Sequence, residues 1–295
     1  MSIGNYFKRG FQFILKGQPI VKNSVTANII SLSPNDLLKG RCALVTGGTS
    51  GIGKEIAKSF IEAGAFVVIT GRNQARIDDV CQEIEDSVSK KKSIKGVALN
   101  NRNTNSFQET INRVLEICPN HRIDILVNNA GILSNDNFGN ANPEEFDAVL
   151  ETNLKGTFFL SQLVAHHMKD NHIEGNILNI ASSSSLRPAA SAYTISKWGI
   201  RGLTLGMAKM LAPHRIVVNG IAPGPTATPM LMRQGVKENI YNSQSITGRY
   251  IKPEEIANMA VILVSNMSRM IVGDIIYMTG GAGLLTTDDI NYSFK

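Results

Sequence analysis

The 295-residue chain contains few cysteines and no long hydrophobic run. No stretch approaches the roughly 18 to 20 apolar residues that a transmembrane helix requires, so the sequence contains no predicted membrane span. The three cysteines, Cys42, Cys81 and Cys118, lie far apart and form no CxxC pattern. Their odd number, together with the absence of a recognisable secretory signal, predicts reduced, buried thiols in a cytoplasmic protein. No metal site is predicted.

Acidic residues are missing from the first 35 positions, which carry four basic residues, Lys8, Arg9, Lys16 and Lys22. These four account for most of the formal net charge of +6. The rest of the chain is nearly balanced and lacks the Lys/Arg blocks that are typical of nucleic-acid-binding proteins. We therefore expect no nucleic-acid partner.

Residues 1–37 form a predicted basic N-terminal extension, and residues 38–295 a single domain. Apolar residues at helical spacing predict a short amphipathic helix within the extension, at Phe7, Phe11, Ile14 and Leu15. Such a segment, residues 1–35, can pack on its own or a neighbouring subunit, or lie on an anionic membrane surface. An acid-free amino terminus is also typical of organellar transit peptides, and the sequence alone leaves these alternatives open.

From position 41 onward, short β-branched apolar runs alternate with helix-like segments. The runs predict strands at 42–48, 66–72, 94–99, 123–131, 176–182, 215–224 and 274–281. Strands that alternate with helices are typical of βαβ units, and hence of a parallel sheet covered on both faces. The predicted fold is α/β, a single-domain, doubly wound, Rossmann-like sheet.

A glycine-rich stretch, VTGGTSGIG, joins the first predicted strand to the first predicted helix. Gly47, Gly51 and Gly53 allow a sharp turn that brings bare backbone against a ligand, and the following helix begins with free N–H groups and a positive dipole end. This context predicts a pyrophosphate site. The remaining predicted contacts of the turn are Thr49, Ser50 and Ile52.

No acidic residue follows the second predicted strand, where a carboxylate would bind the adenosine ribose and repel a 2′-phosphate. The sequence there reads TGRN, with Arg72 just past the strand. A guanidinium pairs well with a phosphate. NADP(H) is therefore predicted in preference to NAD(H).

Tyr193 and Lys197 stand four residues apart in SAYTISKWG. On a helix this spacing places both side chains on one face. A neighbouring ammonium stabilises a phenolate, so Lys197 is expected to lower the pKa of Tyr193 from its usual value near 10. The pair is a predicted general acid–base device.

These motifs occur in order with NNAG at 128–131, Asn153 in ETNLKG, NIASSSS and PGPTATPM. Together they resemble the short-chain dehydrogenase/reductase family over about residues 38 to 284. The resemblance implies a catalytic set of Asn153, Ser182, Tyr193 and Lys197. In it Tyr193 exchanges a proton with the carbonyl or alcohol oxygen, Lys197 also binds the nicotinamide ribose, and Asn153 holds a water in a proton relay. The cofactor contacts that it implies, besides Tyr193 and Lys197, are Asn129, Ala130, Gly131, Pro223, Gly224, Thr226 and Thr228.

Two departures from the family pattern concern Ser182 and Asn100. Ser182 lies only eleven residues before Tyr193, about two fewer than is usual, so Ser183, Ser184 or Ser185 could supply the substrate-orienting hydroxyl instead. Asn100 stands where the family commonly has an aspartate that contacts adenine, and its amide oxygen can still accept a hydrogen bond.

The predicted function is an NADP(H)-dependent oxidoreductase that interconverts a small carbonyl compound and an alcohol. A 3-oxoacyl-carrier-protein reductase is one specific alternative, and sugar or steroid dehydrogenases fit equally well. A non-catalytic dinucleotide sensor is a further alternative, disfavoured because the catalytic set is intact. The resemblance also implies a homodimer or homotetramer.

Overall fold

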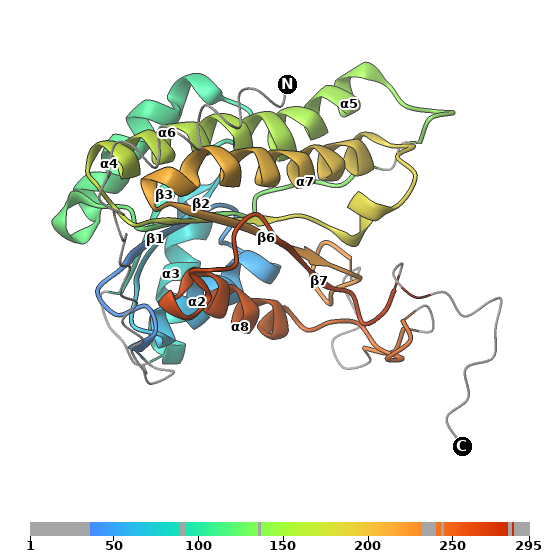
Figure 1. Cartoon of the computed structure of the whole chain (residues 1–295). Helices are drawn as coiled ribbons and strands as arrows, with labels where there is room; N and C mark the ends of the chain where they lie inside the picture. The colour runs from blue at the N-terminus through green and yellow to red at the C-terminus, as the bar shows by residue number, and fades with distance from the viewer. Residues whose placement is uncertain are drawn as a thin grey trace, which may run out of the picture. The chain divides into compact units, whose positions relative to one another are not determined.

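The computed structural model describes residues 36–88, 93–134, 137–231, 240–242, 245–282 and 285. Strands and helices alternate along this part of the chain (Figure 1). The strands are β1 (Cys42–Val45), β2 (Phe66–Gly71), β3 (Ile94–Ala98), β4 (Ile125–Asn128), β5 (Asn176–Ile180), β6 (Val217–Pro223) and β7 (Ile275–Met278). The helices are α2 (Gly51–Glu62), α3 (Gln74–Val88), α4 (Phe107–Ile117), α5 (Pro143–Leu150), α6 (Gly156–Asp170), α7 (Ala192–Leu211) and α8 (Pro253–Val264).

The described strands form one seven-stranded sheet in the order β3-β2-β1-β4-β5-β6-β7. All neighbouring pairs are parallel, for example Leu44 of β1 with Val68 of β2 and Leu126 of β4. The strand order reverses between β1 and β4. In doubly wound sheets this reversal leaves a crevice at the carboxyl ends of the strands, where ligands bind. The predicted α/β, Rossmann-like fold is confirmed.

Two hydrophobic cores cover the two faces of the sheet. Side chains of α2, α3 and α8, such as Phe60, Ile77 and Ile256, pack against one face. Side chains of α4, α6 and α7, such as Phe107 and Leu160, pack against the other, and Figure 1 shows these two helical layers on opposite sides of the sheet. Because both faces are covered, the strands are apolar runs without alternation.

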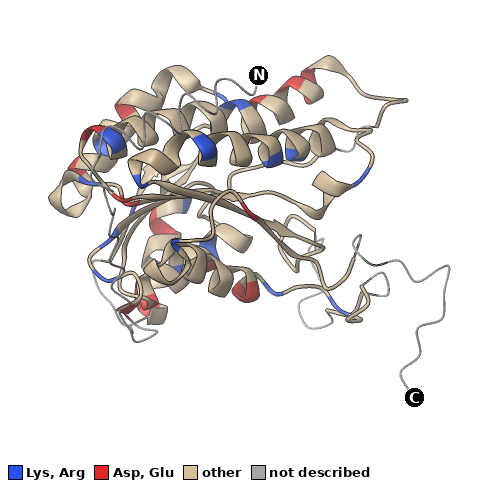
Figure 2. Cartoon of the chain, in the orientation of Figure 1, with Lys and Arg blue, Asp and Glu red and all other residues tan. Residues whose placement is uncertain are grey.

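Charged residues of both signs occur on the helices of both layers (Figure 2). Among the described residues no helix is long and apolar enough to cross a membrane.

All described residues belong to one compact unit, Ser33–Lys295. Residues 1–35, with the predicted amphipathic helix, lie outside the described part of the chain, so the predicted boundary at position 37 stays a prediction.

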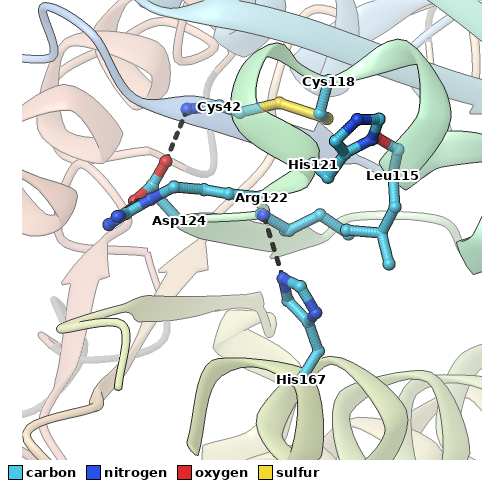
Figure 3. Close-up of a disulfide and its surroundings, with 8 residues drawn as sticks. Cys42, Leu115, Cys118, His121, Arg122, Asp124 and His167 are labelled. Atoms are coloured by element: carbon cyan, nitrogen blue, oxygen red, sulfur yellow. Dashed lines mark hydrogen bonds and ion pairs between the residues drawn. A yellow bond between two sulfur atoms is a disulfide. The ribbon is translucent and has the colours of Figure 1, made fainter. Parts of the chain in front are cut away.

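A disulfide joins Cys42 at the start of β1 to Cys118 directly after α4 (Figure 3). The prediction of reduced thiols is therefore wrong for this pair, although both side chains are buried as expected. The two cysteines are 76 residues apart in sequence, and only the packing of α4 on the sheet brings their Cα atoms to 6.2 Å. Cys81 is a free thiol, and burial raises its pKa to about 11.

Candidate active site

The glycine-rich turn after β1 is shaped by close contacts that only glycine permits. Gly47 and Gly51 have positive φ angles of 64° and 54°, in the left-handed region that other residues rarely adopt. A Cβ on Gly53 would lie 2.4 Å from the carbonyl oxygen of Gly47 and 2.3 Å from Nδ2 of Asn129. The turn is therefore a cradle of bare backbone.

The N-terminus of α2 opens at this cradle. Ser50 is the N-cap residue, but its side chain makes no capping hydrogen bond, and the first turn of α2 contains no acidic residue. The free N–H groups and the positive end of the helix dipole thus remain available to an anion. These features fit the pyrophosphate of a dinucleotide.

Hydrogen bonds made by Thr46 and Asn129 stabilise the glycine-rich turn. Oγ1 of Thr46 accepts hydrogen bonds from the N–H groups of Asn129 (3.0 Å) and Ala130 (3.1 Å). Nδ2 of Asn129 donates to the carbonyl oxygens of Thr46 and Gly47, at 3.0 Å each. The carboxamide of Asn129 thus supports the turn, and Thr46 is a site residue that the sequence analysis missed. Its only sequence signal was its place directly before the glycines.

Three predicted residues lie just after the carboxyl ends of β1, β2 and β3. Arg72 is exposed just after β2, and the adjacent Gly71 packs beside the methyl group of Thr49. Asn100, after β3, is also exposed, and its Oδ1 accepts a hydrogen bond from the N–H of Arg102 (3.1 Å). That oxygen keeps a second lone pair for another donor.

The segment after β6 contacts the glycine-rich turn through Thr228. Gly224 packs against the backbone of Thr279, where a Cβ would come within 2.8 Å. The hydroxyl of Thr226 donates to the carbonyl oxygen of Gly224 (2.9 Å). Thr228 lies against Gly51, whose Cβ would be 3.1 Å from the Thr228 methyl group. Of the predicted residues of this segment, the contacts place Thr228 at the predicted pyrophosphate site.

Tyr193 lies in the first turn of α7, a helix that Ser191 caps by accepting a hydrogen bond from the N–H of Thr194 (3.2 Å). The side chain of Ser182 is close enough to the hydroxyl of Tyr193 to lower the pKa of the phenol. Ser182 directly follows β5, and its Oγ also accepts a hydrogen bond from the N–H of Ser184 (3.1 Å). Among the four candidate serines, this contact favours Ser182 as the one beside Tyr193.

Lys197 is buried beneath Tyr193, one helical turn further along α7. Its Nζ donates to the carbonyl oxygen of Ile180 (2.8 Å) and lies 5.7 Å from the centre of the Tyr193 ring. Burial lowers the pKa of Lys197 to about 8. At neutral pH most of the lysine is still charged.

The expected lowering of the Tyr193 pKa does not hold in the protein alone. Burial of the phenol raises its pKa, and the nearby side chain of Ser182 opposes this effect. The physical reason is that a site with little water disfavours the phenolate. Lys197 meanwhile donates to Ile180. Tyr193 is therefore held as a protonated phenol at neutral pH.

Asn153 lies in a π-helical turn, Glu151–Lys155, between α5 and α6. Its Oδ1 accepts a hydrogen bond from the N–H of Ile132 (2.8 Å), while its Nδ2 donates to the Ile132 carbonyl (3.0 Å) and to Oγ of Ser196 (3.1 Å). Single π turns inside helices are frequent at functional sites. Both N–H groups of the carboxamide are thus occupied by protein atoms, so the carboxamide can bind a water only at the second lone pair of Oδ1.

A backbone cradle that fits a pyrophosphate, together with a buried Tyr–Lys–Ser group, is typical of a nicotinamide-dependent oxidoreductase. The sequence pattern of the family described as short chain dehydrogenase matches residues 41–239. The chain belongs to this family, whose members act on CH–OH groups and bind NAD(P).

Relatives of known name and structure cover most of the chain. A 3alpha-hydroxysteroid dehydrogenase of Mediterraneibacter gnavus is 36% identical over 251 residues, 83% of this chain and 98% of the relative. The 3-ketoacyl-(acyl-carrier-protein) reductase of Brucella melitensis, solved with NADH, is 32% identical with a TM-score of 0.75, covering 83% and 99% of the two chains. A short chain dehydrogenase of Burkholderia cenocepacia, solved with NADP, is 31% identical with a TM-score of 0.73, covering 83% and 98%.

Proposed function

We propose that the protein is an NADP(H)-dependent oxidoreductase that reduces a ketone to a secondary alcohol, or the reverse, with Tyr193 as the proton donor or acceptor. The observation that carries this proposal is the convergence of Ser182, Tyr193 and Lys197 at the carboxyl ends of the central strands. A protonated phenol beside a serine hydroxyl is a suitable acid for a carbonyl oxygen.

The bound dinucleotide would supply or accept the hydride. The hydroxyls of Ser182 and Tyr193 would hold the substrate oxygen between them, and Tyr193 would transfer its proton to that oxygen. The phenolate left behind is anionic in a buried site. The ammonium of Lys197, still mostly protonated at neutral pH, would stabilise that anion through electrostatic attraction.

The residues present fit a dinucleotide. The cradle formed by Gly47, Gly51 and Gly53 and the open N-terminus of α2 would hold the pyrophosphate. Arg72 would pair with the 2′-phosphate of NADP(H), and no acidic residue follows β2 to repel it. The related structures were solved with either NADH or NADP. The proposed preference for NADP(H) over NAD(H) therefore rests on Arg72.

Replacement of Arg72 by alanine should weaken the binding of NADPH and leave the binding of NADH nearly unchanged. We expect kcat/KM for NADPH to fall by about 10- to 100-fold, since a charge-assisted phosphate contact is lost, while kcat/KM for NADH changes less than about twofold. Arg113→Ala, at an exposed position of α4, is the control. If wild-type protein preferred NADH, or if both variants behaved alike, the assignment of Arg72 would be wrong.

The substrate is proposed only as a class, a secondary alcohol or its ketone. The relatives named as acting on a hydroxysteroid and on a 3-ketoacyl carrier protein suggest two probes, a 3-oxosteroid and acetoacetyl-CoA. Oxidation of NADPH followed by absorbance, with each probe, tests the proposal. If neither probe nor any of a wider panel of ketones and sugars is reduced, the proposed function is wrong.

A homo-oligomer is proposed from an apolar surface on the outer side of α5 and α6. A hollow of about 410 Å³ is lined there by Asp147, Leu150, Glu151, Leu154, Lys155, Phe158 and Phe159. Phe158 and Phe159 are 44% and 40% exposed, which is unusual for adjacent aromatic residues unless a partner covers them. Light scattering should give the mass of a dimer or tetramer, and Phe158→Glu should reduce it. A monomeric wild-type protein would contradict this.

The cytoplasmic location stays a prediction from the sequence.

A further inference from the structure

Ser196, which the catalytic set does not include, links two parts of the site. It is fully buried in α7. Its Oγ donates to the carbonyl oxygen of Tyr193 (2.6 Å) and accepts a hydrogen bond from Nδ2 of Asn153 (3.1 Å). One hydroxyl thus connects the backbone of the proposed proton donor to the side chain of Asn153 in the π turn.

The same face of α7 packs closely on the π turn one helical turn further on. Gly199 has no side chain, and a Cβ there would lie 2.7 Å from a methyl group of Leu154. Because residues three apart lie on one face of a helix, Ser196 and Gly199 together set how α7 meets the π turn. Gly199 provides the space and Ser196 provides the polar contact.

The hydroxyl of Ser196 also determines how the Asn153 carboxamide is held. Because its proton is committed to Tyr193, its lone pairs face Asn153, whose second N–H would otherwise be buried without an acceptor. The rest of that carboxamide makes the two bonds to the backbone of Ile132. Ile132 directly follows the Gly131 of NNAG. A fixed Asn153 therefore ties the loop after β4 to α7.

We propose that Ser196 is a positioning residue for the proton transfer, acting through Asn153 and Tyr193. Its hydroxyl holds the Asn153 carboxamide on Ile132 and fixes the backbone of α7 at Tyr193. It touches no reacting atom. This inference rests on the proposed function, and small displacements of an acid–base group reduce turnover strongly.

Thr204 provides a closely matched control on the same helix. It is also fully buried. Its hydroxyl donates to the carbonyl oxygen of Ile200 (2.8 Å) and accepts a hydrogen bond from Nδ2 of Asn179 (2.8 Å). Ser196→Ala and Thr204→Val each remove one buried hydroxyl with the same pattern of partners, but only the first removes a contact to Asn153.

The test combines turnover with hydrogen exchange. For S196A we expect kcat with NADPH and acetoacetyl-CoA, or with a 3-oxosteroid, to fall about tenfold or more, with KM for NADPH within about twofold of wild type. We expect the limbs of its pH–rate profile to shift, and the Ile132 amide proton to exchange about tenfold faster. T204V should retain the wild-type values for all of these.

Three results would overturn the inference: wild-type kcat in S196A, unchanged exchange at Ile132 in S196A, or an equal loss of turnover in T204V. Failure of the proposed function gives a different result, a wild-type protein that reduces no ketone. In that case exchange at Ile132 still tests whether Ser196 holds Asn153, and unchanged exchange in S196A overturns the link.

Discussion

Replacement of Tyr193 by phenylalanine is expected to reduce kcat by about 10²- to 10⁴-fold, the range that general acid–base catalysis contributes. The phenyl ring still fills the space above Lys197. The Kd for NADPH, measured by fluorescence titration, should therefore change less than about threefold. The variant therefore separates proton transfer from cofactor binding.

Tyr277→Phe is the matched control for Tyr193→Phe. The hydroxyl of Tyr277 is buried and has no hydrogen-bond partner among the described residues, so its removal should leave kcat unchanged. If Tyr193→Phe retained wild-type turnover, or if Tyr277→Phe lost as much, Tyr193 would not be the proton donor.

Replacement of Lys197 by methionine is expected to make the protein more stable and much less active. Burial lowers the pKa of Lys197 from 10.5 to about 8, and each pKa unit corresponds to about 1.4 kcal/mol. Keeping the lysine charged at pH 7 therefore costs the folded state about 3 kcal/mol. Loss of the hydrogen bond leaves the buried Ile180 carbonyl without a donor and costs about 1 to 3 kcal/mol, which leaves a net gain of at most about 2 kcal/mol. We expect kcat to fall about 100-fold, since the phenolate loses its counter-charge.

The pH dependence of this stability difference has a definite sign. Below about pH 8 both the folded and the unfolded chain carry a charged Lys197, and the full cost is present. Between about pH 8 and the unfolded pKa near 10.4, the folded state releases the proton first, so wild-type stability rises with pH. The advantage of Lys197→Met in urea unfolding should therefore be largest at pH 7 and smaller at pH 10. A variant that is destabilised equally at both pH values would contradict this.

The fold was predictable from the sequence because local patterns determine it. The apolar runs of β1, β4 and β5 and the intervening helices specify βαβ units, and their parallel pairing then places the ends of these strands on one edge. For the same reason the glycine-rich turn, the loop after β4 and Ser182 could be expected at one crevice from their positions in the sequence.

What the sequence did not reveal depends on contacts between distant segments. The bond between Asn153 and Ser196 spans 43 residues, and the disulfide of Cys42 and Cys118 spans 76. Neither has a local pattern. The sequence analysis also predicted the wrong direction for the pKa shift of Tyr193, because the spacing of Tyr193 and Lys197 indicates their proximity but not their burial. Burial is a property of the assembled core.

The central claim is that Tyr193 and Lys197 face a bound nicotinamide. It is tested most directly by a crystal structure of the protein with NADPH. We predict that the Tyr193 hydroxyl points into the nicotinamide pocket, with the hydroxyl of Ser182 beside it and Nζ of Lys197 on the same side of the cofactor. A Tyr193 hydroxyl directed away from the nicotinamide, or a cofactor that does not contact the glycine-rich turn, would contradict the account.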